Sequence, residues 1–232
     1  EFYNRHNYPA IYLGKPLPDH IDAWRAGLPD NSSLRLSLGL DERPVVALLA
    51  GSRLQEVTRM LPVMAAAAPS YPDYQFAVAA MDHLPARLYE EAAAKYGIKI
   101  INGKTYDLLA VAEAALVTSG TATLEAALFD VPQVVCYSTS PLTYHLAKLV
   151  IKVRFISLVN LVMDREVVRE LIQGDLNLMN LHRELALVLS TGYRHQLIKK
   201  DYAELREALG GGGASGRVAA DMVTDLLQNR AL

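Results

Sequence analysis

Apolar residues along the chain gather into short runs, and longer segments of helical composition lie between these runs. Unbroken apolar character over the length of one strand is typical of a strand that is covered on both faces. Such strands are predicted over Val45–Ala50, Tyr74–Ala80, Ile98–Ile101, Ala114–Val117 and Val134–Tyr137. Helices are predicted between them, over Glu56–Ala68, Pro85–Tyr96, Thr105–Ala112 and Thr121–Phe129. This alternation predicts an α/β fold with a doubly wound parallel sheet.

The pattern changes after Pro141. Residues 144–155 predict a helix that runs into a short strand, and residues 157–175 predict a loop that leads into a short helix. The rest is helical, and the glycines at 210–213 predict a flexible joint before a final helix over 216–227. We therefore divide the chain into a lead-in at 1–30, a central α/β domain at 31–190 and C-terminal helices at 191–232.

Composition and charge narrow the class of protein. With 51% hydrophobic and 21% charged residues, the chain is an ordinary globular one, and a net charge of −2 gives no indication of nucleic-acid binding. Cys136 is the single cysteine, which excludes an intramolecular disulfide, and the six histidines have no metal-ligand spacing. Apolar stretches are interrupted by charges, so no transmembrane span is predicted. The chain begins at Glu1 without a methionine, and we interpret it as processed or as the later part of a longer protein.

Two polar turns follow buried strands of the predicted sheet. The first is Gly51-Ser52-Arg53, where glycine permits close backbone approach and arginine offers a planar donor fork to a phosphate. The second, Thr118–Thr121, joins a strand to a helix, and the unpaired N–H groups and dipole of that helix favour an anion. Because carboxyl ends of parallel strands meet at one edge, both turns are expected to open on the same side.

Glu125 lies one turn into the helix that follows the second turn. Four residues span roughly 6 Å of helix, which is comparable to the separation of a diphosphate and its ribose. Glu125 is therefore a candidate acceptor for ribose hydroxyls. In the alternative interpretation, Ser119 or Thr121 is only an N-cap and Glu125 is a solvated carboxylate, and this segment alone favours that alternative.

Four ordered motifs together carry a family resemblance: GSRLQEV, VTSGTATLEAAL, SLVNLVMDREVVRELIQGD and ASGRVAADMV. With the opening YLGKPLPDHI, they resemble the later half of the lipid-A-disaccharide synthase family, GT-B glycosyltransferases of Gram-negative lipid A biosynthesis. The sequence differs from the usual family residues at Lys15, Ala50, Val159 and Arg169.

The resemblance implies that residues 31–190 form the nucleotide-sugar-binding, Rossmann-like domain of a two-domain enzyme. The family transfers 2,3-diacylglucosamine from its UDP donor to 2,3-diacylglucosamine 1-phosphate, giving a β-1′,6 linkage and UDP. By resemblance, Arg53 contacts the diphosphate, the Ser119–Thr121 turn receives phosphate and Glu125 holds the ribose. The residues expected to bind substrate are Gly51, Ser52, Arg53, Thr118, Ser119, Gly120, Thr121, Glu125, Asn160, Glu170 and Gln173.

The family's first half, with the acceptor site and the expected general base, has no counterpart in these residues. The chain alone is therefore expected to bind donor without transferring sugar, and no cofactor or metal is expected. The resemblance further implies a cytoplasmic protein, peripheral to the inner membrane through the full protein, and a possible homodimer with residues 210–213 as a swap hinge. Two alternatives stay open. The first is another GT-B enzyme with a UDP-N-acetylglucosamine-type donor, including an epimerase, although the acid–base pair that an epimerase needs is not evident. The second is a noncatalytic nucleotide-binding module.

Overall fold

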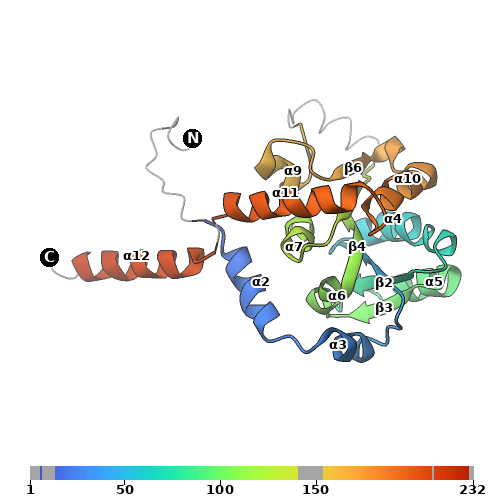
Figure 1. Cartoon of the computed structure of the whole chain (residues 1–232), viewed down its shortest axis with the longest axis horizontal. Helices are drawn as coiled ribbons and strands as arrows, with labels where there is room; N and C mark the ends of the chain where they lie inside the picture. Colours follow the sequence, from blue (N-terminus) through green and yellow to red (C-terminus); the bar gives the residue numbers. More distant parts are fainter. Residues whose placement is uncertain (1–5, 7–13, 141–153, 211, 230–232) are drawn as a thin grey trace.

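A parallel sheet of six strands forms the centre of the molecule (Figure 1). The computed structural model describes residues 6, 14–140, 154–210 and 212–229. The strand order is β3-β2-β1-β4-β5-β6 and every pairing is parallel. The strands are β1 (Val45–Leu49), β2 (Gln75–Ala80), β3 (Lys99–Asn102), β4 (Ala112–Thr118), β5 (Gln133–Tyr137) and β6 (Arg169–Ile172). The predicted doubly wound α/β class is confirmed.

Helices cover both faces of this sheet. Right-handed crossovers place α4 and α5 on one face and α6, α7 and α9 on the other. Helix α10 lies on the α4 face, where the Tyr71 hydroxyl donates to the His182 carbonyl at 3.0 Å, and α11 packs on α7 and α9. The helices are α2 (Pro16–Ala26), α3 (Asn31–Ser37), α4 (Leu54–Ala65), α5 (Arg87–Tyr96), α6 (Thr105–Val111), α7 (Ala122–Leu128), α9 (Leu158–Met163), α10 (Leu178–Val188), α11 (Arg194–Ala208) and α12 (Ala214–Asn229).

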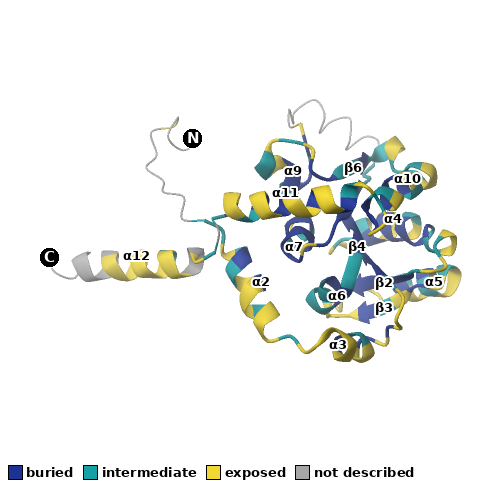
Figure 2. Cartoon of the chain, viewed as in Figure 1, coloured by how far each residue is buried: buried dark blue, intermediate teal, exposed yellow. Residues whose placement is uncertain are grey.

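The core lies along the central strands, which Figure 2 shows in the colour of buried residues. Every residue of β1 and β2 is buried, because helices cover these strands on both sides. Their sequences, VVALL and QFAVAA, are almost wholly apolar, as such a position requires. The continuous apolar runs therefore correspond to the strands in the middle of the sheet.

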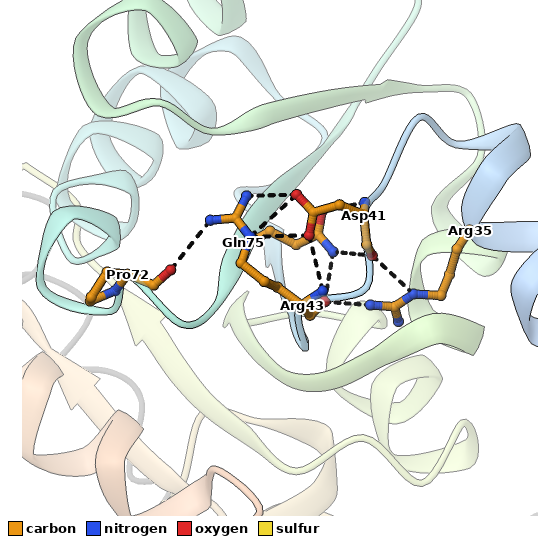
Figure 3. A network of polar contacts seen from close by, with 5 residues as sticks. All are labelled: Arg35, Asp41, Arg43, Pro72 and Gln75. Atoms are coloured by element: carbon orange, nitrogen blue, oxygen red, sulfur yellow. Dashed lines mark hydrogen bonds and ion pairs between the residues drawn. The ribbon is translucent and has the colours of Figure 1, made fainter.

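A network of polar contacts connects the segment before β1 to the first residue of β2, at the amino-terminal end of the sheet (Figure 3). Gln75, the first residue of β2, donates to the carbonyls of Asp41 and Arg43 at 2.7 and 2.6 Å and accepts from the Asp41 N–H at 3.1 Å. Arg43 pairs with the Asp41 carboxylate at 2.7 Å, and these hydrogen bonds lower the pKa of Asp41 to about 2. The segment that enters β1 is thus tied to β2 at the amino-terminal ends of the strands. The polar turns lie at the other end of the sheet, after the carboxyl ends of β1 and β4.

The C-terminal glycines separate two helices as predicted. Gly210, Gly212 and Gly213 all have positive φ, between 75° and 107°, which L side chains rarely adopt. Helix α12 extends from the body beside α2, and the Gly213 N–H donates to the Asp19 carboxylate (Figure 1). The predicted final helix over 216–227 lies within α12.

The sequence-based prediction for residues 157–175 is wrong in its order of elements. The structure has helix α9 first, over Leu158–Met163, and then the edge strand β6 followed by a 3-10 turn over Gln173–Asp175. Strand β6 exists because Arg169 to Ile172 pair in register with Val134 to Tyr137 of β5, and such pairing overrides local propensity. Most of the helix and strand predicted over 144–155 falls outside the described residues.

Candidate functional site

The candidate site lies where the strand order reverses. Strands β1 and β4 are neighbours, with Leu49 opposite Val117, and the chain leaves them toward opposite sides of the sheet. Open α/β sheets bind ligands at such a switch point, outside the carboxyl ends of the strands. A cavity of about 510 Å³ occupies this position. It is lined by Leu49, Gly51, Ser52, Arg53, Glu56, Ala79, Met81, Thr105, Tyr106, Thr118, Ser119, Gly120, Thr121, Ala122 and Glu125.

This cavity confirms that the two predicted turns open on the same edge of the sheet. Among the described residues that line it, Arg53 is the sole cation, and Glu56 and Glu125 are carboxylates. The cavity wall therefore contains a cation at the start of α4 and a carboxylate on α7.

The first turn is held in shape by Glu56. Its Oε2 atom accepts hydrogen bonds from the N–H groups of Ser52 and Arg53 at 3.0 and 3.2 Å, which forms a capping box at the start of α4. Its Oε1 atom pairs with the Arg53 guanidinium at 3.0 Å, while 82% of the Arg53 side chain remains exposed. Gly51 has a φ of 108°, and a Cβ atom there would lie 2.6 Å from the Glu56 side chain. Glycine is thus required for Glu56 to close over the loop.

The second turn leaves several polar groups without partners. The Thr118 hydroxyl is buried and has no hydrogen-bond partner within the described part of the chain. The N–H groups of Gly120, Thr121 and Ala122 donate to no described atom either. Buried polar groups are nearly always paired in native proteins, so the Thr118 hydroxyl, which lines the cavity, is a candidate hydrogen-bonding group for a ligand.

Neither hydroxyl of this turn caps the helix that follows it. The Ser119 hydroxyl donates to the Ile156 carbonyl at 2.8 Å, and Thr121 makes no side-chain capping bond to α7. Thr121 therefore occupies the N-cap position of α7 without a side-chain capping bond, and the Ser119 hydroxyl instead joins the turn to the segment before α9.

Glu125 lies in the cavity wall and is not a solvated helix carboxylate. Between Thr123 and Phe129 it is the one position that is not buried, because the other side chains of α7 pack on the sheet and on α9. Its Oε1 atom accepts the hydroxyl hydrogen of Tyr106 at 3.1 Å. Burial raises the pKa of Glu125, and burial together with the Glu125 charge raises the pKa of Tyr106 to about 12.

Three residues of the later motif lie outside the cavity lining. The Asn160 side chain is fully buried and makes four hydrogen bonds, to the N–H groups of Val167 and Val168, the Val168 carbonyl and the Glu170 carboxylate. Glu170 also accepts from the N–H groups of Ile156 and Ser157 at 3.0 Å each. The Gln173 side chain bonds both backbone groups of Thr139.

These contacts hold the segment at residues 156–157, and Ser119 of the cavity is bonded to that segment. The polar atoms of Asn160 and Gln173 are engaged within the protein, so their contact with a donor sugar stays a prediction.

Sequence reasoning missed three polar residues of the cavity, Glu56, Thr105 and Tyr106. Glu56 had a partial signal, because a glutamate three residues after the N-cap position occurs in capping boxes, but the N-cap residue here is Arg53 and not serine or threonine. Tyr106 had none, since its approach to Glu125 joins two helices, α6 and α7, that are separated in the sequence by a strand.

Comparison with known proteins gives consistent matches along the chain. A family model described as lipid-A-disaccharide synthetase matches residues 1–219. The lipid-A-disaccharide synthase of Syntrophus aciditrophicus (strain SB) is 36% identical over 229 residues, which cover 96% of this chain and 59% of that protein. The chain spans about 60% of the length of the curated relatives it matches. The resemblance indicated by the sequence motifs is thereby confirmed.

Solved structures share the fold. The UDP-GlcNAc 2-epimerase from Neisseria meningitidis, bound to UDP-GlcNAc, aligns with a TM-score of 0.62 at 14% identity, over 95% of this chain and 57% of that one. A glycosyltransferase from Rickettsia africae ESF-5 aligns with a TM-score of 0.58 at 9% identity, over 91% of this chain and 55% of that one. None of the helices in the described ranges combines the length and apolar character that a membrane crossing requires.

Proposed function

Because the chain belongs to the lipid-A-disaccharide synthetase family, we propose that it is the donor-binding part of a glycosyltransferase of lipid A biosynthesis. The proposed reaction transfers 2,3-diacylglucosamine from its UDP donor to 2,3-diacylglucosamine 1-phosphate and releases UDP. The observation that carries this proposal is the cavity at the switch point, where Arg53 and Glu125 lie at separate positions in the wall. A nucleotide diphosphate needs a cation and a hydroxyl acceptor arranged in this way.

The donor is oriented by the charges of the cavity. The exposed Arg53 guanidinium binds the diphosphate, and the unpaired N–H groups of residues 120–122 and the Thr118 hydroxyl supply further donors. Glu125 accepts the ribose hydroxyls. When the glycosidic bond breaks, negative charge grows on the diphosphate, so donors already fixed at that position stabilise the leaving UDP.

The remaining chemistry is proposed to come from a part of the full-length protein outside these residues. That part presents the acceptor and supplies the general base that deprotonates its hydroxyl. The full protein is proposed to work at the cytoplasmic face of the inner membrane, where both acylated substrates reside, and to form a homodimer. The relatives are longer than this chain, which supports such a division of labour.

The first test is titration of Arg53→Ala with UDP and with uridine. A charge-assisted fork is worth on the order of 1.5–3 kcal/mol, so UDP affinity is expected to fall tenfold or more while uridine affinity stays nearly unchanged. Arg53→Lys should recover part of the loss, because an ammonium lacks the planar fork. The matched control is Arg87→Ala, which removes an equally exposed arginine that also pairs with a glutamate, on α5 outside the cavity. Equal losses for UDP and uridine would contradict the assignment of Arg53 to the diphosphate.

The second test measures UDP release and disaccharide formation from the diacylated donor and acceptor. The full-length protein should turn over and lose that activity on Arg53→Ala, while this chain alone should bind UDP without transfer. Tighter binding of UDP-N-acetylglucosamine than of the diacylated donor would instead favour another sugar-nucleotide enzyme. UDP binding without any turnover by the full-length protein would leave only a nucleotide-binding module.

A further inference from the structure

Tyr106 is a cavity residue whose hydroxyl group is directed to the proposed ribose acceptor. It donates to Glu125 Oε1 at 3.1 Å, and both side chains line the cavity. The contact joins α6, the helix before β4, to α7, the helix after β4. A hydroxyl that bonds a carboxylate in a ligand cavity influences what that carboxylate can accept.

The Tyr106 ring is fixed by aromatic neighbours. Its centroid lies 5.5 Å from Trp24 in an edge-to-face arrangement, 5.3 Å from Phe129 and 5.9 Å from His20. These residues come from α2 and from the end of α7, so three helices set the position of one hydroxyl group. Aromatic pairs at such separations are attractive beyond their area of burial, which restrains the ring.

We propose that Tyr106 is a positioning residue that holds the Glu125 carboxylate as the acceptor for both ribose hydroxyls and thereby selects ribonucleotides over deoxyribonucleotides. The inference rests on the proposed function, in which Glu125 meets the ribose. A carboxylate has about four lone-pair sites, so one bond from Tyr106 leaves capacity for two hydroxyl donors. The bond also limits rotation of the carboxylate, so less conformational entropy is lost when the ribose binds.

Tyr106 affects the charge of Glu125 as well as its orientation. Burial raises the pKa of Glu125, whereas the hydrogen bond from Tyr106 and the nearby His20 lower it. The groups that act on Glu125 are His20 from α2 and Tyr106 from α6, and Arg53 and Glu56 at the start of α4 are the other charged residues that line the cavity. Removing the Tyr106 hydroxyl takes away one of the two interactions that lower the pKa of Glu125, so Glu125 becomes protonated at a higher pH. A protonated Glu125 has less capacity to accept from the ribose.

The experiment compares Tyr106→Phe with the wild type by calorimetric titration with UDP and with 2′,3′-dideoxy-UDP between pH 5 and 8. Loss of one hydrogen bond is expected to weaken UDP about three- to tenfold at neutral pH, and dideoxy-UDP less than about twofold, so the selectivity for ribose narrows. The fall in UDP affinity on acidification should begin at a higher pH in the variant. Tyr96→Phe, on α5 and outside the cavity, is the matched control and should behave as wild type.

The outcomes separate this inference from the proposed function. Equal weakening of both nucleotides by Tyr106→Phe, or an acid limb that does not move, overturns the positioning role even if Arg53→Ala still abolishes UDP binding. If the wild type fails to bind UDP at all, the proposed function fails first. Circular dichroism and thermal unfolding of Tyr106→Phe verify that the variant is folded. The terminal phosphate of both nucleotides also titrates in this range, so the acid limb is read from the ratio of UDP affinity to dideoxy-UDP affinity, and in Glu125→Gln, which lacks the carboxyl group, this ratio should not change with pH.

Discussion

Replacing Asn160 by alanine tests whether a buried amide organises the loop beside the cavity. All four hydrogen-bonding positions of this side chain are used, at 2.8 to 3.0 Å, and the residue has no exposed surface. The Val167 N–H keeps a second acceptor in the Arg165 carbonyl, and Glu170 keeps the N–H donors of Ile156 and Ser157, so truncation leaves the N–H and carbonyl of Val168 without these bonds. At about 1–3 kcal/mol for each buried group left unpaired, reduced by relaxation, the expected loss of unfolding free energy is about 2–4 kcal/mol.

Thermal and urea unfolding of Asn160→Ala measure this loss. For a chain of this size, about 2–4 kcal/mol corresponds to a fall in Tm of roughly 5–15 °C. The matched control is Asn102→Ala at the exposed end of β3, which should change stability by less than about 0.5 kcal/mol. A wild-type Tm for Asn160→Ala, combined with weakened UDP binding, would refute the structural role and place Asn160 on the ligand.

Asn160→Asp adds a pH test of the same contact. The new carboxyl group keeps the acceptor oxygen but replaces the amide that donates to Glu170 Oε1 at 2.8 Å, so two carboxyl groups face each other in a buried site. Burial and the neighbouring charge raise the pKa of the introduced acid in the folded state above its unfolded value of about 4. The penalty is therefore small below that unfolded value and grows as pH rises through the folded pKa. Urea midpoints at pH 5 and pH 8 should differ more for the variant than for wild type.

Two further substitutions probe other parts of the fold. Gly51→Ala places a Cβ atom 2.6 Å from the Glu56 side chain at a residue whose φ is 108°. The first turn should therefore be destabilised by about 1–3 kcal/mol, and UDP binding should weaken. An unchanged urea midpoint would contradict this expectation. Tyr202→Phe removes a buried hydroxyl that accepts from Gln133 at 3.0 Å and donates to the Val131 carbonyl at 3.3 Å. It should cost about 1–2 kcal/mol in urea unfolding with no change in UDP affinity, and a change in affinity would show that the far side of α7 is coupled to the cavity.

The central strands and both turns could be predicted from sequence because their signals are local. A strand covered on both faces has an apolar sequence whatever its partners are, so β1 and β2 were evident before the fold was known. The turns follow from them, since a polar turn after such a strand must lie at the ligand edge of a parallel sheet.

Strand β6 was missed because its signal is not local. Its sequence, RELI, buries only Leu171, and it becomes a strand through pairing with β5. The environment of Asn160 depends on that strand, because the partners of its side chain are Val167, Val168 and Glu170 at the start of β6 or just before it. The motif alone gave no indication that the Asn160 side chain is buried and bonded to the segment before β6, and its contact with a donor stays a prediction.

The same fold explains why the cavity is formed before any ligand binds. Glu56 fixes the first turn through two backbone N–H groups, and Tyr106 bonds Glu125 through one hydroxyl, so two parts of the cavity wall are held by neighbouring side chains. The Thr118 hydroxyl also lines the cavity and has no partner in the described chain. Fixed side chains reduce the entropy that binding must overcome, and an unpaired hydroxyl gives a ligand a new hydrogen bond to make. Affinity for a nucleotide should therefore depend on Glu56 and Tyr106 as well as on the groups that would touch the ligand.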